Sequence, residues 1–199
     1  MKLKIILPYL VILLFCNTNI YSRELPVLKI YFSGNNLNYE EYIPGSIILE
    51  DSDNNSILEL PAKFKTRGAT ARQYNMKPSF NMKLETAEGE EIDENLLGIR
   101  KASSFILDAM AIDRICMRNR VCFDIWNSYS RLPYDTDFDS RNGTLGKFVI
   151  VYINDNYKGI YCLTDKINRK LLDLKKPQVS SDGDVTIRGV LYKQGTNDI

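Results

Sequence analysis

Short runs of alternating apolar and polar residues recur along the chain after residue 24. Residues 25–32 (LPVLKIYF) and 79–84 (SFNMKL) alternate in this way, and residues 46–60 contain two short apolar runs, GSIILE and SILEL. Alternation with a period of two predicts strands that bury one face. The residues between the two runs, 51–55, are rich in Asp and Asn and predict a hairpin loop. Residues 25–85 are therefore expected to form a small antiparallel sheet.

The pattern changes its period at residues 113–129 (DRICMRNRVCFDIWNSY). Apolar side chains gather at four positions and polar side chains at four others, which predicts an amphipathic helix. Asp113 is expected to cap this helix, because its carboxylate can accept bonds from the free amides of the first turn. The apolar set is Cys122, Phe123, Ile125 and Trp126, and the polar set is Arg118, Asn119, Asp124 and Asn127.

A second group of strands is expected in the last third of the chain. Residues 147–153 (KFVIVYI) and 159–164 (GIYCLT) flank the turn-favouring triplet Asn154-Asp155-Asn156, which predicts a hairpin. Residues 180–183 are expected to form a loop, and residues 185–192 to contribute one more strand pair. The order of strands, helix and hairpin predicts an α+β fold: an antiparallel sheet with an amphipathic helix and a β-hairpin.

The N-terminus has the pattern of an export signal. Lys2 and Lys4 precede an apolar run at residues 5–15 and a polar stretch at 17–22. The run is shorter than the roughly 20 residues of a spanning helix. A signal peptide over residues 1–22, cleaved after Ser22, predicts an exported protein: periplasmic, on the cell surface or extracellular. A lipid anchor at Cys16, which follows the bulky Phe15, and an uncleaved anchor are the alternatives.

Composition excludes several classes of function. With 26 basic and 25 acidic side chains, the chain lacks the basic excess of a nucleic-acid-binding protein. Its 44% apolar residues, with 12 Tyr and 8 Phe, indicate a folded chain. Histidine is absent, which excludes Ser-His-Asp, Cys-His and HExxH chemistry. Any reaction must therefore use carboxylates, lysine, arginine, hydroxyls or thiols.

Cysteine spacing predicts no metal site. Cys116, Cys122 and Cys162 remain after the expected signal, and an odd number cannot pair fully within one chain. No CxxC spacing occurs, so no zinc site is predicted. These thiols are expected to be buried and to pack as small apolar groups.

The segment Arg67-Gly68-Ala69-Thr70 is a candidate for phosphate contact. Arg67 offers a planar fork suited to phosphate or carboxylate. Gly68 lets the backbone approach a bound group, and Thr70 can donate to a phosphate. Taken alone, the segment is a weak signal and is more typical of a plain turn.

Four more residues are candidates by their place at strand ends. Lys77 and Lys83 flank and end the strand at residues 79–84, where one of them can contact a phosphate. Asp165 follows the hairpin and can orient a ligand, and Lys193 closes the last expected strand. Each is in isolation also typical of a solvated surface residue.

Four segments, taken in order, resemble the CotH kinase family. They are RGATARQYNMKPSFNMKL at 67–84, DRICMRNRVCFDIW at 113–126, VYINDNYKGIYCLTDKIN at 151–168 and GVLYK at 189–193. They are similar to the RGN-S/T…KKPYKLKL, D-x-T-x-L-R-N-x-L-A-x-x-L/I-W, VYVNGEYxGVYxLxExI and G-x-LYK elements of that family. The resemblance covers roughly residues 25–193.

This resemblance implies a fold like the N-terminal lobe of an atypical protein kinase, with residues 67–84 facing the nucleotide. It also implies binding of ATP with magnesium and transfer of phosphate to Ser or Thr of protein substrates, such as spore-coat proteins. Such transfer depends on positioned cations and a metal held by carboxylates. The implied nucleotide-binding residues are Arg67, Gly68, Thr70, Lys77, Lys83, Asp165 and Lys193; no residue is implied as catalytic.

Departures from the family pattern suggest a partial kinase. Ala69 stands where the family has Asn, and Asp165 stands where it has Glu. The family's magnesium-binding aspartates lie further along, so residues 23–199 are expected to be a domain truncated before the metal-binding C-terminal half and inactive alone. Its expected partner is a protein substrate or that missing lobe, with membrane contact only through the signal or a lipid anchor.

Two other readings remain open. The chain can be a non-catalytic cell-surface interaction or carbohydrate-associated module built on the same fold. It can also be an unrelated exported structural domain, a reading that the four ordered segments disfavour.

Overall fold

Seven strands close into a β-barrel in the computed structural model of the protein, which describes residues 25–34, 37–51, 57–68, 76–131, 142–187 and 189–191. Around the barrel the strands follow the order β1-β2-β3-β4-β5-β7-β6. Their bounds are Val27–Phe32 (β1), Ile43–Glu50 (β2), Ile57–Arg67 (β3), Ser79–Leu84 (β4), Ser104–Asp108 (β5), Gly146–Ile153 (β6) and Asn156–Asp165 (β7).

The alternating residues place one side of every strand inside the barrel. β4 is typical, since Phe80, Met82 and Leu84 are buried while Asn81 and Lys83 between them are partly exposed. A strand turns successive side chains to opposite faces, so each strand adds two or three apolar residues to one shared core. The residues that fill the interior are Leu28, Ile30, Ile47, Leu49, Ala62, Phe64, Phe80, Met82, Leu84, Phe105, Leu107, Val149, Val151, Ile153, Tyr161 and Leu163.

Two long-range pairings close the barrel. β1 runs parallel to β6, with Val27 opposite Ile150, although more than a hundred residues separate them. β5 lies antiparallel between β4 and β7. Closure leaves no free sheet edge, which protects the strands from pairing with other chains.

The segment between β4 and β5 covers one end of the barrel. Leu96, Ile99 and Ala102 are almost fully buried and join the core. Isolated bridges tie this segment to itself, between Glu85 and Glu91 and between Glu94 and Ala102. It therefore seals the interior at the end where Asp165 completes β7.

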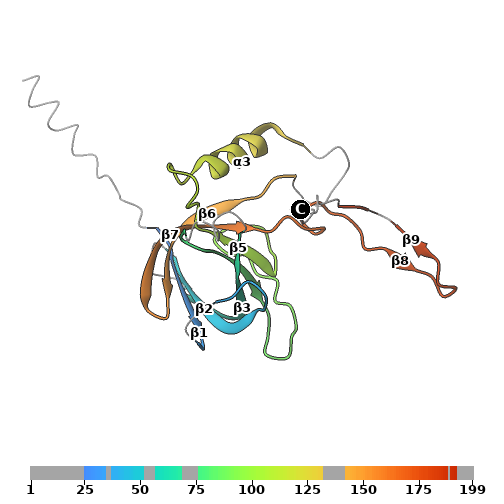
Figure 1. The fold of residues 1–199 in the computed structure, drawn as a ribbon. Coiled ribbons are helices and arrows are strands. Elements are labelled where there is room, and N and C mark those ends of the chain that lie inside the picture. Colours follow the sequence, from blue (N-terminus) through green and yellow to red (C-terminus); the bar gives the residue numbers. More distant parts are fainter. Residues whose placement is uncertain are drawn as a thin grey trace, which may run out of the picture.

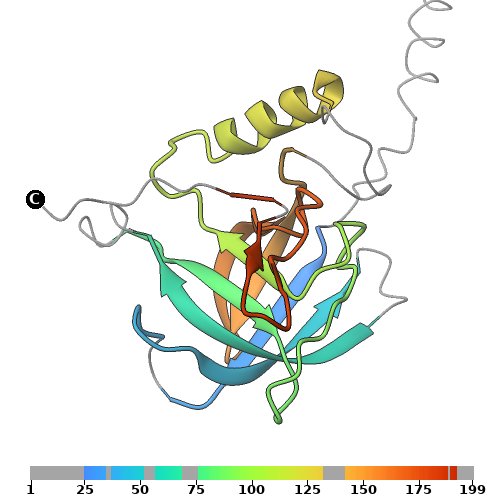
Figure 2. The ribbon, with the colours of Figure 1, turned by 90° about the vertical axis from the view of Figure 1, so that its right-hand side faces the viewer.

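A single helix, α3, is found in the described residues and spans Arg118–Tyr129. It crosses above the barrel, over the side that carries β5, β6 and β7 (Figures 1 and 2). The residues after β7 lead away from the barrel into a short hairpin, Gln178–Val179 (β8) and Val185–Thr186 (β9) (Figure 1). Both strands of this hairpin are exposed.

The predicted strands were largely right and the predicted fold class was wrong. β1 and β4 match the expected runs, β2 and β3 form the expected pair, and Asn154-Asp155 turns between β6 and β7. Both turn residues have positive φ, 47° and 62°, as the tightest hairpin turns require. The described chain is mostly β and closes into a barrel, and is not an α+β kinase N-terminal lobe. The reason is that closure depends on β5 and on the β1–β6 pairing, which local alternation does not reveal.

The predicted amphipathic helix was also wrong in its bounds and its face. α3 begins at Arg118, five residues after Asp113. Its apolar residues Val121, Ile125, Trp126 and Tyr129 are exposed, and the one fully buried side chain is Arg120. The helix is attached to the barrel by polar groups, and of its large apolar side chains only Phe123 faces the barrel.

Two of the three thiols also differ from the expectation of burial. Cys116 and Cys122 are exposed, and only Cys162, on β7, is buried. Burial raises the pKa of the Cys162 thiol to about 11, so this group stays protonated near neutral pH.

The export signal predicted at residues 1–22, with its alternative anchor at Cys16, lies outside the described residues. Within the described ranges, no helix has the length and apolar character needed to cross a membrane.

Candidate functional site

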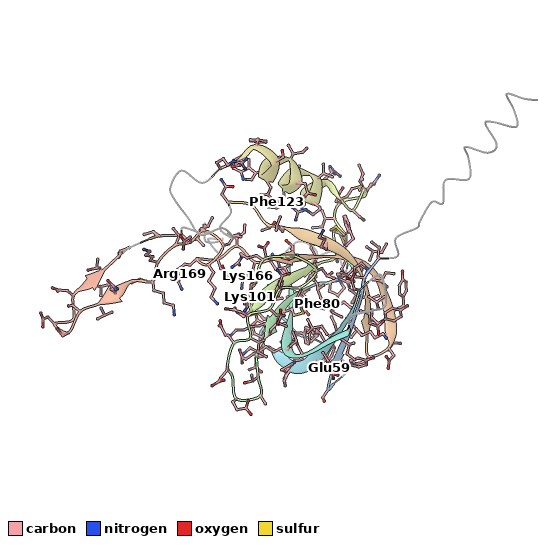
Figure 3. The ribbon with its side chains drawn as sticks, turned by 180° about the vertical axis from the view of Figure 1, so that it is seen from behind. Glu59, Phe80, Lys101, Phe123, Lys166 and Arg169 are labelled. Carbon is pink, nitrogen blue, oxygen red and sulfur yellow. The ribbon has the colours of Figure 1, made fainter. Side chains whose placement is uncertain are left out.

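A pocket of about 790 Å³ lies between α3 and the outer surface of the barrel. Its floor consists of outward-facing residues of β3, β4, β5 and β7, and Phe123 of α3 lies on the helix side that faces the barrel (Figure 3). This volume falls within the roughly 300–1,000 Å³ of small-molecule sites. Its lining is Tyr42, Lys65, Arg67, Asn81, Ile106, Asp108, Met110, Asn119, Arg120, Phe123, Thr144, Cys162, Thr164, Asp165, Lys166, Ile167 and Leu191.

Sheet register arranges the floor in rows that run across the strands. Lys65 lies opposite Asn81, Asn81 opposite Ile106, and Ile106 opposite Thr164. The next row begins at Arg67, which lies opposite Ser79. Residues directly opposite on neighbouring strands have Cβ atoms about 4.5–5.5 Å apart, so each row forms a continuous strip. The floor is therefore polar and is carried by a rigid closed sheet.

Two cations of β3 project from this floor. Lys65 and Arg67 are two positions apart on one strand and share a face. The ammonium of Lys65 lies 5.0 Å from the centre of the Tyr42 ring. Neither cation forms a salt bridge within the described part of the chain. Both remain available to an anionic ligand.

Asp108, at the end of β5, organises the turn that leaves the barrel toward α3. Its carboxylate accepts bonds from the Ser79 hydroxyl (3.2 Å) and the Met110 amide (2.9 Å). The Ser79 hydroxyl in turn accepts a bond from the Ala109 amide (2.9 Å). Met110 adopts a positive φ of 54°, which a non-glycine residue holds only when its surroundings enforce it. Asp108 thus has a structural role while it lines the pocket.

Polar contacts attach α3 to the barrel above the pocket. Arg120 and Asn127 both donate to the carbonyl oxygen of Thr144, at 2.7 and 2.9 Å. Arg120 also contacts Asp124 one turn along the helix, with N–O distances of 2.9 and 2.8 Å. The helix thereby holds Asn119, Arg120 and Phe123 over the floor.

A buried ion pair lies at one end of the pocket. Arg100 Nε is 3.6 Å from Asp165 Oδ2, and the two side chains are 5% and 0% exposed. Burial raises the pKa of the Asp165 carboxyl, and the neighbouring guanidinium partly offsets this effect. Asp165 Oδ1 accepts a bond from the Leu145 amide (3.0 Å), whereas Oδ2 has no hydrogen-bond partner in the described structure.

Arg67 and Asp165 are the candidate residues from the sequence that line the pocket. Gly68 follows the end of β3 with a φ of 110°, a conformation that favours glycine. Thr70 and Lys193 lie outside the described residues.

Lys77 does not line the pocket. Its ammonium lies 3.8 Å from the centre of the Tyr161 ring and donates to the Ile160 carbonyl (2.6 Å). Desolvation lowers the pKa of Lys77. The Lys77 ammonium is therefore bonded to residues of β7 and is not presented to a ligand.

Lys83 faces outward on β4 but is already paired. Its ammonium lies 2.7 Å from Glu85 and 3.1 Å from Glu91. The hydrogen bond to Glu85 is the main reason that the pKa of Lys83 is raised. Its charge is therefore balanced within the protein, and it does not line the pocket.

Sequence reasoning missed three residues that shape the pocket: Lys65, Asn81 and Arg120. A signal for the first two existed. Lys65 lies two residues before Arg67, and Asn81 occupies a polar position in the alternating run of β4, so period two places both outside the barrel. No local signal marks Arg120, because arginine on a helix is normally solvent-exposed.

The described residues do not fit a magnesium site. Among them, no group of three acidic or cysteine side chains is positioned to hold a metal ion. Asp108 and Asp165 line the pocket, but one oxygen of each carboxylate already accepts a bond from a backbone amide. The arrangement is suited instead to binding an anion, with Lys65 and Arg67 as the cations and apolar side chains beside them.

Comparison with protein families places the chain beside known sequences. The family model described as CotH kinase protein matches residues 64–198, about two thirds of the chain. The match includes the four segments singled out in the sequence, and it begins at β3 rather than at residue 25. No curated protein matches the chain.

Proposed function

Since the chain belongs to the CotH kinase protein family, we propose that it binds ATP in the pocket between α3 and the barrel. The observation that carries this proposal is the pair of neighbouring cations, Lys65 and Arg67, on the pocket floor. Arginine binds phosphate through two parallel N–H bonds, and lysine binds it as a point charge. The triphosphate of a nucleotide is expected to lie against these two side chains.

The apolar part of the lining supports a nucleotide over a simple anion. Ile106, Met110 and Phe123 line the same pocket as the two cations. An aromatic ring and aliphatic side chains offer a surface for a flat base, while polar groups orient the ligand. In the proposed complex the base therefore lies toward Phe123.

Phosphoryl transfer is the activity implied by the family, with Ser or Thr of a protein as the acceptor. Magnesium would supply charge neutralisation at the phosphates when bound. The described residues do not fit a magnesium site, so the proposal for them is limited to nucleotide binding. A kinase-like protein that needs further acidic residues to complete transfer is the reading that these observations favour.

The test is a calorimetric titration of ATP, with and without magnesium, into the purified protein. Replacing Arg67 by Ala, or Lys65 by Ala, is expected to weaken binding by about tenfold to a hundredfold, as for loss of a charged hydrogen bond. Lys158→Ala is the charge-matched control, because Lys158 is exposed on the β6–β7 hairpin and does not line the pocket. Equal affinity in all four proteins would contradict the assigned site.

A non-catalytic interaction module on the same barrel is the second candidate. Two observations favour it: no three-acid cluster occurs in the described residues, and the apolar side chains of α3 are exposed. Absence of ATP binding by a folded protein, with β-sheet content confirmed by circular dichroism, would support this candidate over the first.

A further inference from the structure

A continuous series of contacts connects the buried Arg100–Asp165 pair to α3. It passes from the carboxylate of Asp165 to the Leu145 amide, along the backbone to Thr144, and from the Thr144 carbonyl to Arg120 and Asn127. Each contact joins a different part of the fold: the barrel interior, the segment before β6 and the helix. The series ends at the wall of the proposed nucleotide pocket.

The buried Arg100–Asp165 ion pair, where this series starts, is energetically unfavourable. Taking two charges out of water costs several kcal/mol per ion, and only good geometry offsets this cost. Here the closest charged atoms are 3.6 Å apart, and three atoms of the pair, Arg100 Nε and Nη2 and Asp165 Oδ2, make no hydrogen bond in the described structure. The pair is therefore a poor source of stability. A role for Asp165 is better sought in the hydrogen bond that its carboxylate accepts from the Leu145 amide.

Both backbone polar groups of Leu145 are bonded to the end of β7. The Leu145 amide donates to Asp165 Oδ1 at 3.0 Å. The Leu145 carbonyl accepts from the Thr164 hydroxyl at 2.7 Å and from the Asp165 amide at 3.3 Å. With its amide and its carbonyl both engaged, the backbone of Leu145 has a defined position relative to β7.

The neighbouring residue, Thr144, provides the attachment of the helix. Its carbonyl accepts bonds from both Arg120 and Asn127. Together with Phe123, these helix residues occupy positions i, i+3 and i+7, which share one face of a helix. They are among the few helix positions that are not fully exposed.

Arg120 of α3 also packs closely against Gly146 at the start of β6. A Cβ atom on Gly146 would lie 2.7 Å from Arg120 Nη1 and 2.9 Å from the Cys162 sulfur. The guanidinium therefore fits against the start of β6 only because residue 146 has no side chain.

We infer that Asp165 is a positioning residue that sets the place of α3 over the pocket, acting through the Leu145 amide and the Thr144 carbonyl. Its consequence for ligand binding rests on the proposed function, since it assumes that the pocket takes ATP. Its consequence for the helix does not, because the contacts that attach α3 join residues of the protein alone.

Two double variants separate this role from the stability of the barrel. In Arg100→Met with Asp165→Leu, both charges and the acceptor for the Leu145 amide are removed. In Arg100→Met with Asp165→Asn, both charges are removed but an acceptor oxygen remains. Replacing a buried pair by apolar groups of similar size is often neutral for stability, so both proteins are expected to fold.

The measurement is hydrogen exchange of the full chain followed by mass spectrometry, without nucleotide. In the Leu variant we expect the amides of α3 to exchange about three- to tenfold faster, as for loss of one hydrogen bond, while β4 and β5 remain protected. The Asn variant is expected to exchange like the unaltered protein. Arg120→Met, which removes one of the two helix donors to the Thr144 carbonyl, should also loosen α3, and adding it to the Leu variant should give less than the sum of the two effects.

Equal protection of α3 in the Leu and Asn variants, with the strands intact in both, would overturn the inference. Simultaneous loss of protection in α3 and the strands of both variants would also overturn it, because Asp165 would then act on the whole barrel.

Calorimetric titration with ATP then separates the two proposals. We expect the Leu variant to bind about three- to tenfold more weakly than the Asn variant. If the unaltered protein binds no ATP while α3 still loosens only in the Leu variant, the proposed function fails and the positioning role of Asp165 stands.

Discussion

The barrel and α3 are stabilised by opposite means. In the barrel, apolar side chains from all seven strands meet in one interior, and outward positions carry the polar residues. In α3, the inward face is Arg120, Phe123 and Asn127, and the other apolar side chains, Val121, Ile125, Trp126 and Tyr129, are exposed. The hydrophobic effect therefore determines the barrel, whereas a few hydrogen bonds determine the position of the helix.

The comparison matters for function because the pocket lies between the two regions. A floor on a closed barrel is rigid, since its residues cannot move without disturbing the packed interior. A wall attached by a few hydrogen bonds to Thr144 and Asn142 can move at a far lower cost. The cations Lys65 and Arg67 thus belong to the rigid side, and Phe123 belongs to the adjustable side.

The largest effect is expected from truncation inside the barrel. Phe105 of β5 is fully buried, and Phe105→Ala should lower the free energy of unfolding by about 3–5 kcal/mol. Urea denaturation followed by fluorescence measures this loss. Tyr129→Ala, which truncates an exposed aromatic residue of α3, is the control and should change stability by less than about 0.5 kcal/mol. Similar losses of stability in both variants would contradict the claim that apolar burial stabilises the barrel but not α3.

A smaller effect is expected where the two regions touch. Gly146→Ala places a methyl group against Arg120 and Cys162, and overpacking of this kind costs about 1–3 kcal/mol. The same denaturation experiment measures it, with the exposed neighbour Lys147→Ala as the control. An unchanged free energy of unfolding would contradict the close packing of Arg120 against residue 146, because α3 could then move away from β6 without loss of stability.

A pH-dependent effect is expected at the start of α3. Bonds donated by backbone amides, chiefly that of Arg118, lower the pKa of Asp113 to about 2. Because the folded-state pKa is depressed, this stabilisation is present above the unfolded pKa of about 4 and is lost as pH falls toward about 2. Protection of the α3 amides, followed by NMR, should decline across that interval.

The matched variant is Asp113→Asn, which should show weaker α3 protection at neutral pH and no further change between pH 4 and 2. A normal titration of Asp113 near its unfolded pKa would contradict this prediction. The barrel strands serve as the internal reference in both proteins.

The smallest effect is expected on the outer face of α3. Ile125 is more than half exposed, so Ile125→Ser should alter the free energy of unfolding by no more than about 0.5 kcal/mol. Urea denaturation at two protein concentrations measures it. A loss above about 1 kcal/mol would show that this face is covered in solution.

The sequence predicts the barrel strands better than it predicts the orientation of α3. Strands β1, β4, β6 and β7 were predictable because burial on one face imposes alternation, which is a local pattern. The same pattern could have identified Lys65 and Asn81 as outward neighbours of Arg67. The face of α3 was not predictable, since Cys122, Phe123, Ile125 and Trp126 are apolar yet only Phe123 turns toward the barrel.

The candidate lysines show the same limit. Lys77 and Lys83 were both plausible phosphate ligands by their place beside β4. Their availability depends on which side chains and carbonyls the fold brings beside them: Tyr161 and the Ile160 carbonyl for Lys77, and Glu85 and Glu91 for Lys83. No spacing rule contains that information.

The sequence by itself determined the family, most of the strands, the exclusion of histidine chemistry and the candidacy of Arg67. These depend on residue types and on patterns within a few positions. The tertiary structure alone decided the closure of the barrel, the burial of Arg100, Arg120 and Asp165, and the meeting of Lys65 and Arg67 with Phe123 in one pocket. Those features depend on which distant segments pair, and a parallel contact between β1 and β6 leaves no trace in the local pattern of either strand.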